Sequence, residues 1–117
     1  MGNFRNLGVW TKSKDFAVKI YTLTNKGIIS RDFGFKDQIR RSAVSIPSNI
    51  AEGDSQGSDK QAIRYFKIAK GSSSELYTQL VIAMEIGYLS NEDSELLDEC
   101  NLFSAMLQNL IKSRLSK

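Results

Sequence analysis

The side chains with the greatest capacity for chemistry lie in two rows at helical spacing. The first row belongs to the segment QIRRSAVSIPSNIAEG, between Gln38 and Gly53, and the second lies further along the chain. If two helices place these rows face to face, Arg41 can pair with Glu75, and hydroxyl and amide groups can satisfy one another. The residues of this predicted polar network are Arg41, Ser45, Asn49, Glu52, Ser72, Glu75 and Gln79.

Three interpretations of the polar network differ in what it does. A half-buried network would fix the register of the two helices, and we favour this structural interpretation. Part of the row could instead face a partner chain or a ligand, although no cofactor motif accompanies it. A third interpretation makes Glu52 and Glu75 an acid/base pair, because two carboxylates in different environments can divide those roles. Nothing else in the sequence supports catalysis by this pair.

A row of basic side chains forms a second candidate site. Lys60, Arg64 and Lys67 recur at i, i+4 and i+7, so they share one face of a helix. Basic side chains gathered on one face can bind the phosphates of a nucleic acid through charge alone. The alternative is a solvated face whose charges have local acidic partners. The predicted phosphate contacts are Arg40, Lys60, Arg64, Lys67 and Lys70.

The composition argues against an enzyme and against a metal centre. Histidine is absent, which removes the commonest general base and the commonest metal ligand. Cys100 is the single cysteine, so neither an internal disulfide nor a cysteine-based metal site can form. We therefore expect a non-enzymatic protein with no cofactor and no metal.

The charge is unevenly distributed along the chain. Residues 1–70 carry a net charge of +7 and residues 71–117 a net charge of −4, within a total of +3. This asymmetry favours contact with nucleic acid or head-to-tail self-association, and the alternative is an ordinary dipolar surface. No run of about 18 apolar residues is present and the N-terminus lacks the apolar core of a signal peptide, so we expect a cytoplasmic protein without membrane contact.

Four amphipathic helices must position these residues. Short connections between them predict a single domain, residues 1–117, folded as an all-α, antiparallel up-down four-helix bundle. Pro47 lies within the second helix and is expected to kink that helix or break it in two. Gly71, within the third helix, is expected to permit the close approach of a neighbour. The apolar periodicity predicts helices over about 10–26, 35–52, 59–87 and 91–115.

The third helix carries more apolar residues than one buried face requires. Its predicted buried face consists of Ala62, Phe66, Ala69, Ser73, Leu76, Leu80, Ala83 and Gly87. Further apolar residues lie outside that face, namely Ile63, Ile68, Val81, Ile82 and Ile86. A helix that is apolar on two sides needs burial on two sides, so we expect an oligomer rather than a monomer.

The segment QIRRSAVSIPSNIAEG resembles the four helix bundle proteins, also called 23S rRNA intervening-sequence or S23-like proteins. Other segments carry the same resemblance, which covers about residues 7–115: VW at 9–10, IYTLT at 20–24, FGFKDQIRR at 33–41, YFKIAKGSSSEL at 65–76, TQLVIA at 78–83 and GYLS at 87–90. The matching polar positions are Arg40, Arg41, Ser45, Pro47, Asn49, Glu52, Ser72, Glu75 and Gln79. In the first loop, NKGI stands where many relatives have a Phe-Pro pair.

The resemblance implies a homopentamer with a positively charged surface and no enzymatic activity. A related branch of the family serves reverse transcriptases as an accessory protein. Our first hypothesis is therefore a homo-oligomeric bundle that binds RNA, such as rRNA, or DNA through its basic residues. The second is a scaffold for a protein partner such as a reverse transcriptase. A catalytic role for Glu52 and Glu75 is a remote third.

Overall fold

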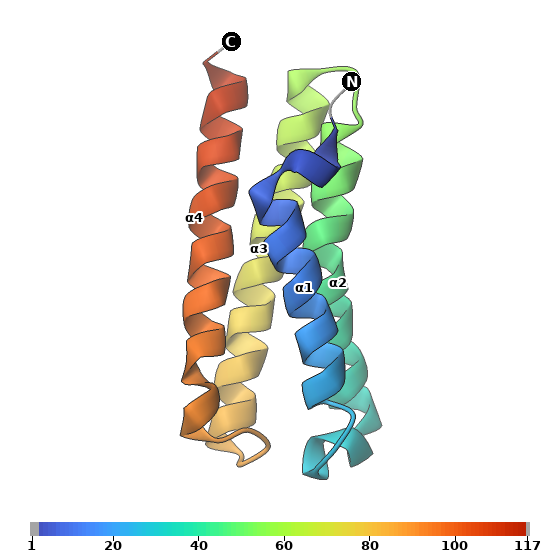
Figure 1. Cartoon of the computed structure of the whole chain (residues 1–117), viewed down its shortest axis with the longest axis vertical. Coiled ribbons are helices and arrows are strands. Elements are labelled where there is room, and N and C mark those ends of the chain that lie inside the picture. Colours follow the sequence, from blue (N-terminus) through green and yellow to red (C-terminus); the bar gives the residue numbers. More distant parts are fainter. Residues whose placement is uncertain (1–2, 117) are drawn as a thin grey trace.

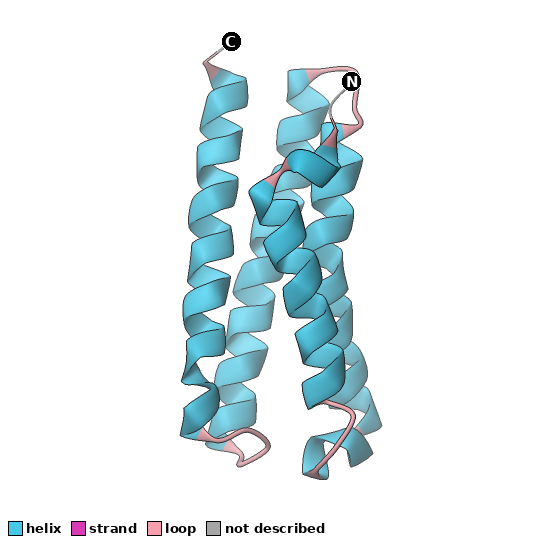
Figure 2. Ribbon diagram, in the orientation of Figure 1, coloured by secondary structure: helices cyan, strands magenta, loops and turns pink. Residues whose placement is uncertain are grey.

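The structure is a computed structural model that describes residues 3–116, and every regular element within this range is helical (Figures 1 and 2). The prediction of an all-α fold is therefore confirmed. Three short 3-10 turns cover Phe4–Asn6, Ile28–Arg31 and Asn91–Ser94. The four long helices are α1 (Gly8–Leu23), α2 (Phe33–Asp54), α3 (Asp59–Glu85) and α4 (Glu95–Leu115).

Consecutive helices run in opposite directions and form an elongated bundle of 47 × 20 × 20 Å (Figure 1). The α2–α3 connection lies at one end, at the top of Figure 1, together with the start of α1 and the end of α4. We call this the upper end. The α1–α2 and α3–α4 connections lie at the lower end. This arrangement confirms the predicted antiparallel four-helix bundle.

Two predicted apolar stripes meet in the core. On α2, Ile39, Ala43, Ile46 and Ile50 are each at most 1% exposed, as their spacing at i, i+4, i+7 and i+11 requires. On α3 the buried residues are Ala62, Phe66, Ala69, Ser73, Leu76, Gln79, Leu80 and Ala83. The rings of Phe16 on α1 and Phe103 on α4 close the core edge to face, with centroids 5.3 Å apart.

Gly87 does not belong to the buried face of the third helix, contrary to prediction. It lies beyond the end of α3, is exposed, and adopts a φ of 81°. The N–H of Tyr88 donates to the carbonyl of Ala83 over 2.8 Å, and the N–H of Gly87 donates to the carbonyl of Met84 over 3.2 Å. Because this closure needs a left-handed residue, glycine ends the helix here.

The second helix continues through Pro47 from Phe33 to Asp54, so Pro47 does not break it in two. Proline removes only one backbone donor, and the Pro47 ring is buried. The apolar stripe packs on both sides of Pro47, which holds the two halves in one helix. A kink at this position stays a prediction.

Two helical glycines have opposite surroundings. A Cβ at Gly53 would lie 2.8 Å from the Phe66 ring and 3.0 Å from the carbonyl oxygen of Ala62, so α2 and α3 approach closely at the upper end. A Cβ at Gly71 would meet nothing within 4 Å. The expectation that Gly71 permits a close approach is therefore wrong, and Gly53 has that role instead.

The observed helices start and end within four residues of the predicted ranges. The largest difference concerns the fourth helix, which begins at Glu95 rather than near residue 91. The segment between forms a 3-10 turn, stabilised by a capping box in which Ser90 and Asp93 exchange hydrogen bonds between side chain and backbone. The local cap therefore starts a tighter turn before the α-helix begins.

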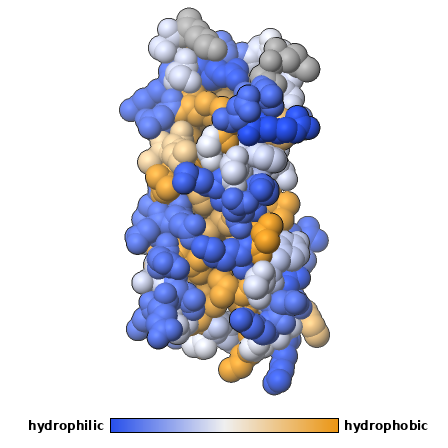
Figure 3. All heavy atoms as spheres, in the orientation of Figure 1, coloured by the Kyte–Doolittle hydropathy of each residue, from blue (hydrophilic) through white to orange (hydrophobic). Residues whose placement is uncertain are grey.

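The contacts between helices are uneven. Helix α2 packs along α1 and α3, and α4 packs along α3, whereas α1 and α4 contact each other much less. In Figure 3, apolar side chains are visible along the seam between α4 and α1, surrounded by hydrophilic ones. Among residues 3–116, no helix is long and apolar enough to cross a membrane.

Candidate functional site

A groove at the upper end brings together the first turns of α3 and the last turn of α4. Its volume is about 750 Å³, which is within the usual range for ligand sites. Most of its wall comes from α3, and the opposite side comes from the end of α4. The residues that line this upper groove are Asp59, Lys60, Gln61, Ile63, Arg64, Lys67, Arg114 and Leu115.

Three of the predicted phosphate contacts line the upper groove. Lys60, Arg64 and Lys67 are exposed and lie on one face of α3. Among residues 3–116, no acidic side chain forms an ion pair with any of them. Three like charges within two helical turns repel one another, so an anion placed between them would relieve this repulsion.

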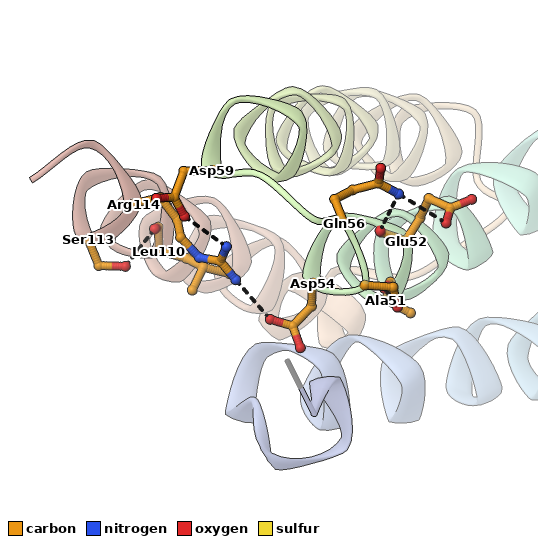
Figure 4. A network of polar contacts seen from close by, with 9 residues as sticks. Ala51, Glu52, Asp54, Gln56, Asp59, Leu110, Ser113 and Arg114 are labelled. Carbon is orange, nitrogen blue, oxygen red and sulfur yellow. Dashed lines mark hydrogen bonds and ion pairs between the residues drawn. The ribbon is translucent and has the colours of Figure 1, made fainter. Parts of the chain in front are cut away.

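Arg114, which the sequence analysis did not place at this site, joins three helices at the upper end. Its Nη2 donates to Oδ1 of Asp54 over 3.0 Å, and its Nη1 donates to Oδ1 of Asp59 over 3.1 Å (Figure 4). The guanidinium also lies 5.6 Å from the centre of the Phe66 ring. Because two carboxylates neutralise it, Arg114 supports the wall of the groove rather than adding free positive charge.

Asp54 is the most buried partner in this contact. Its side chain is 6% exposed, and the second carboxylate oxygen, Oδ2, has no hydrogen-bond partner among the described residues. A buried carboxylate with one unpaired oxygen depends heavily on its remaining partner. The Asp54–Arg114 pair therefore ties the end of α4 to the end of α2.

The apolar part of the upper groove comes from Ile63 and Leu115. Ile63 is half-buried, and Leu115 is 67% exposed at the end of α4. Both side chains lie among basic residues, so the groove combines positive charge with an apolar surface.

The two other predicted phosphate contacts lie elsewhere and are occupied. Lys70 donates to Oε1 of Gln108 on α4 over 2.8 Å. In the lower half, Nε of Arg40 donates to Oγ1 of Thr24 over 2.8 Å, and its guanidinium lies 4.3 Å from the centre of the Tyr21 ring. The structure thus does not place Arg40 on the same surface as Lys60, because Arg40 joins α2 to α1.

The predicted polar rows of α2 and α3 meet at their centre. The hydroxyls of Ser45 and Ser72 lie 2.8 Å apart, and Nδ2 of Asn49 donates to the carbonyl oxygen and the hydroxyl of Ser45 over 2.8 and 2.9 Å. Gln79 is buried, and its Oε1 has no hydrogen-bond partner among residues 3–116. The two serine hydroxyls therefore join α2 to α3 here, and the Asn49 amide bonds within α2.

The predicted pairing of Arg41 with Glu75 is wrong. Nε of Arg41 donates to Oδ2 of Asp37, one turn earlier on the same helix, over 2.8 Å. Glu75 instead accepts a hydrogen bond of 2.6 Å from Ser42, which is buried. Arg41 and Glu75 are both exposed, and each has a partner other than the one predicted. Ser42 follows Ile39 by three residues and precedes Ile46 by four, so helical spacing could have identified it.

Glu52 and Glu75 have different partners and do not bond to each other. Glu52 is exposed and contacts Gln56 of its own helix, with its Oε2 3.4 Å from Nε2 of that residue (Figure 4). Glu75 contacts α2 through Ser42. Among residues 3–116, no group of three potential ligand residues could hold a metal ion.

The single thiol is held in its unreactive form. Cys100 is buried, and desolvation, followed by the nearby charge of Glu99, raises its pKa to about 12. At neutral pH the group is a thiol rather than a nucleophilic thiolate. Cys100 therefore contributes to packing, and its carbonyl accepts a hydrogen bond of 2.9 Å from buried Ser73.

Fold and site together define a class of small, antiparallel helical bundles with a basic groove at one end. The chain belongs to the 23S rRNA-intervening sequence protein family, whose model matches residues 5–109. This match confirms the resemblance found in the sequence.

A solved structure supports the same assignment. It is the crystal structure of a protein with unknown function from the S23 ribosomal protein family of Bacteroides thetaiotaomicron VPI-5482. That protein shares 25% sequence identity with this chain, and the two superpose with a TM-score of 0.77 over 89% of this chain and 98% of the other. No curated protein matches this chain.

Proposed function

We propose that this protein is a non-enzymatic, self-associating bundle that binds RNA or DNA through its upper groove. The observation that carries the proposal is the row of Lys60, Arg64 and Lys67, exposed around a groove and without an ion-pair partner among residues 3–116. A nucleic acid supplies phosphates at regular spacing, and each neutralised phosphate releases counterions. Membership of a family named for an rRNA insertion supports the same proposal.

Exposed apolar surfaces support the proposed self-association. On α3, Ile68, Ile82 and Ile86 are 43%, 44% and 54% exposed. Between α1 and α2 lies a largely apolar groove of about 450 Å³, lined by residues that include Trp10 and Pro47. Copies of the chain that cover these surfaces would bury them from water, and the family resemblance implies five copies. The same surfaces would serve a protein partner such as a reverse transcriptase in the alternative function.

The test of nucleic-acid binding compares two variants with the same change in charge. The groove variant carries Lys60→Gln, Arg64→Gln and Lys67→Gln, and the control carries Lys26→Gln, Arg31→Gln and Arg41→Gln in the lower half. Fluorescence anisotropy measures binding of labelled RNA at several salt concentrations. We expect the groove variant to reduce the slope of log K against log salt by roughly 2 to 3, because each lost contact removes about 0.7 to 0.9.

The control should keep the wild-type slope. Equal losses in both variants would mean that only net charge matters, and undetectable binding of wild type at low salt would refute nucleic-acid binding.

Self-association is tested by light scattering over a range of protein concentrations. The wild-type chain should form a defined oligomer, and Ile82→Glu together with Ile86→Glu should reduce its mass, because charges on the apolar face oppose its burial. A wild-type monomer at every concentration would contradict self-association. Capture of a protein partner without nucleic acid by such a monomer would favour the scaffold function.

A further inference from the structure

The upper groove contains an apolar surface that phosphate binding alone does not require. Leu115 is 67% exposed at the end of α4, and half-buried Ile63 lies between Lys60 and Arg64 in the sequence of α3. Phosphate oxygens gain nothing from contact with aliphatic side chains. A ligand that fits this groove therefore carries both negative charge and apolar surface.

The three basic side chains and Ile63 come from α3, and the more exposed apolar side chain, Leu115, comes from α4. Helical geometry places Arg64 about 6 Å and Lys67 about 10 Å from Lys60 along the axis of α3. Leu115 projects from α4 on the other side of the groove. One side is therefore basic along its length, and the other presents an apolar side chain. A strand with phosphates along one edge and flat bases along the other matches this division.

A nucleic-acid duplex does not match it. In a duplex the bases are paired and stacked, and the outer surface that a concave groove can receive consists of phosphates and sugars. The groove is a hollow of about 750 Å³ between α3 and α4, whereas readout of a duplex in its major groove requires an element that enters that groove. Leu115 would stay uncovered by a duplex but would be covered by an unpaired base.

We infer that the upper groove binds a single-stranded segment of RNA or DNA, with phosphates along the basic side of α3 and unpaired bases against Ile63 and Leu115. The inference rests on the proposed function and specifies its ligand. Arg64 contributes twice, because a guanidinium attracts phosphate and also stacks on the face of a base. No base-specific hydrogen bond is involved, so different sequences bind with similar affinity.

The experiment compares short oligouridine and oligothymidine strands with blunt duplexes that carry the same number of phosphates. Binding of each to the full chain is measured by fluorescence anisotropy at several salt concentrations. The variant Leu115→Ser removes the apolar contact without changing charge. Its control, Leu102→Ser, changes a leucine that is 45% exposed on α4 outside the groove. Circular dichroism melting shows whether each variant keeps the wild-type fold.

We expect wild type to bind each single strand more tightly than its duplex at the same salt concentration. Leu115→Ser should weaken single-strand binding by roughly fivefold, the loss expected for one partly covered leucine side chain. It should leave the salt slope and duplex binding unchanged. Leu102→Ser should bind as wild type does.

The possible failures separate the inference from the proposed function. Duplex binding as tight as single-strand binding, or wild-type affinity in Leu115→Ser, would overturn the single-strand inference and leave nucleic-acid binding intact. Undetectable binding of every nucleic acid at low salt would overturn both. Equally tight binding of a polyglutamate peptide would also overturn the inference, because it would assign the groove to an acidic protein segment.

Discussion

The two ends of the bundle use arginine in different ways. At the upper end, Arg114 lies between the carboxylates of Asp54 and Asp59 and is 16% exposed. In the lower half, Arg40 contacts a hydroxyl, a carbonyl and the ring of Tyr21, all of them neutral. The upper arginine donates hydrogen bonds to two carboxylates in place of water, whereas the lower arginine donates to neutral oxygens. The position of the carboxylates thus determines which basic residues stay available for a ligand.

The unpaired cations lie beside the neutralised arginine. Asp59 is the acidic residue in the lining of the upper groove, and Arg114 already occupies one of its oxygens. Among residues 3–116, Lys60, Arg64 and Lys67 form no ion pair with Asp59 or with another acid. An ion pair that stabilises the fold therefore also leaves the adjacent surface basic. The following predictions test this difference between the ends, from the largest expected effect to the smallest.

Arg114→Ala should cause the largest loss of stability. It leaves the buried carboxylate of Asp54 without its ion-pair partner, which costs about 3 kcal/mol in the free energy of unfolding. Urea denaturation followed by circular dichroism measures the loss. The matched control is Arg41→Ala, whose partner Asp37 and own side chain are 61% and 79% exposed. That variant should lose less than about 0.5 kcal/mol, and equal losses would contradict the difference between buried and exposed pairs.

Gly53→Ala should be the next most damaging change. The added methyl group would clash with the Phe66 ring and the backbone of Ala62, so we expect a loss of roughly 2 kcal/mol. Gly71→Ala is the control, because Gly71 is also helical but has open space around it. It should stabilise the protein by about 1 kcal/mol through helix propensity. The melting temperatures of the two variants should therefore move in opposite directions. Any gain in Gly53→Ala would refute the close approach at the upper end.

Arg40→Ala should have a smaller effect, confined to stability. Loss of the hydrogen bond to Thr24 should reduce the free energy of unfolding by about 1 kcal/mol. The salt slope of RNA binding should stay at the wild-type value, because Arg40 lies outside the upper groove. If the slope decreased by the roughly 0.7 to 0.9 expected for one lost phosphate contact, the two regions would share one binding surface.

The last prediction concerns a loss of stability that appears only at alkaline pH. Burial raises the pKa of Cys100 from 9.0 to about 12, so the folded state holds this proton more tightly than the unfolded state does. The resulting stabilisation is present in full below pH 9 and is lost as the pH rises from 9 to 12. Urea midpoints measured across this range should fall more steeply for wild type than for Cys100→Ala. Identical pH profiles would show that the thiol does not contribute.

The fold could be predicted from the sequence because each helix repeats its apolar residues at a constant spacing. Ile39, Ala43, Ile46 and Ile50 needed only this spacing to be assigned to the core. The close approach at Gly53 could not be found in the same way. The predicted second helix ends at residue 52, before Gly53, whereas Gly71 lies within the predicted third helix. Only the position of the neighbouring helix shows that the close approach is at Gly53.

Side-chain pairing across the bundle was less predictable. Arg40 and Arg41 are adjacent and point about 100° apart, so periodicity indicates that one of them faces outward but not which partner each finds. Arg40 contacts Tyr21 of α1 and Thr24, the residue that follows α1, and Arg41 contacts Asp37 of its own helix. Arg114 contacts Asp54 and Asp59 because the up-down topology brings the end of α4 back to the upper end. Such long-range pairs leave no periodic signal in the sequence.

The topology that returns α4 to the upper end also has a practical effect. The start of α1 and the end of α4 both lie toward the end that carries the groove (Figure 1). A chain immobilised on a sensor chip by a tag at either terminus would turn its binding surface toward the chip and screen it from dissolved strands. Attachment through a cysteine introduced at exposed Lys26, in the connection at the opposite end, would present that surface to the flow.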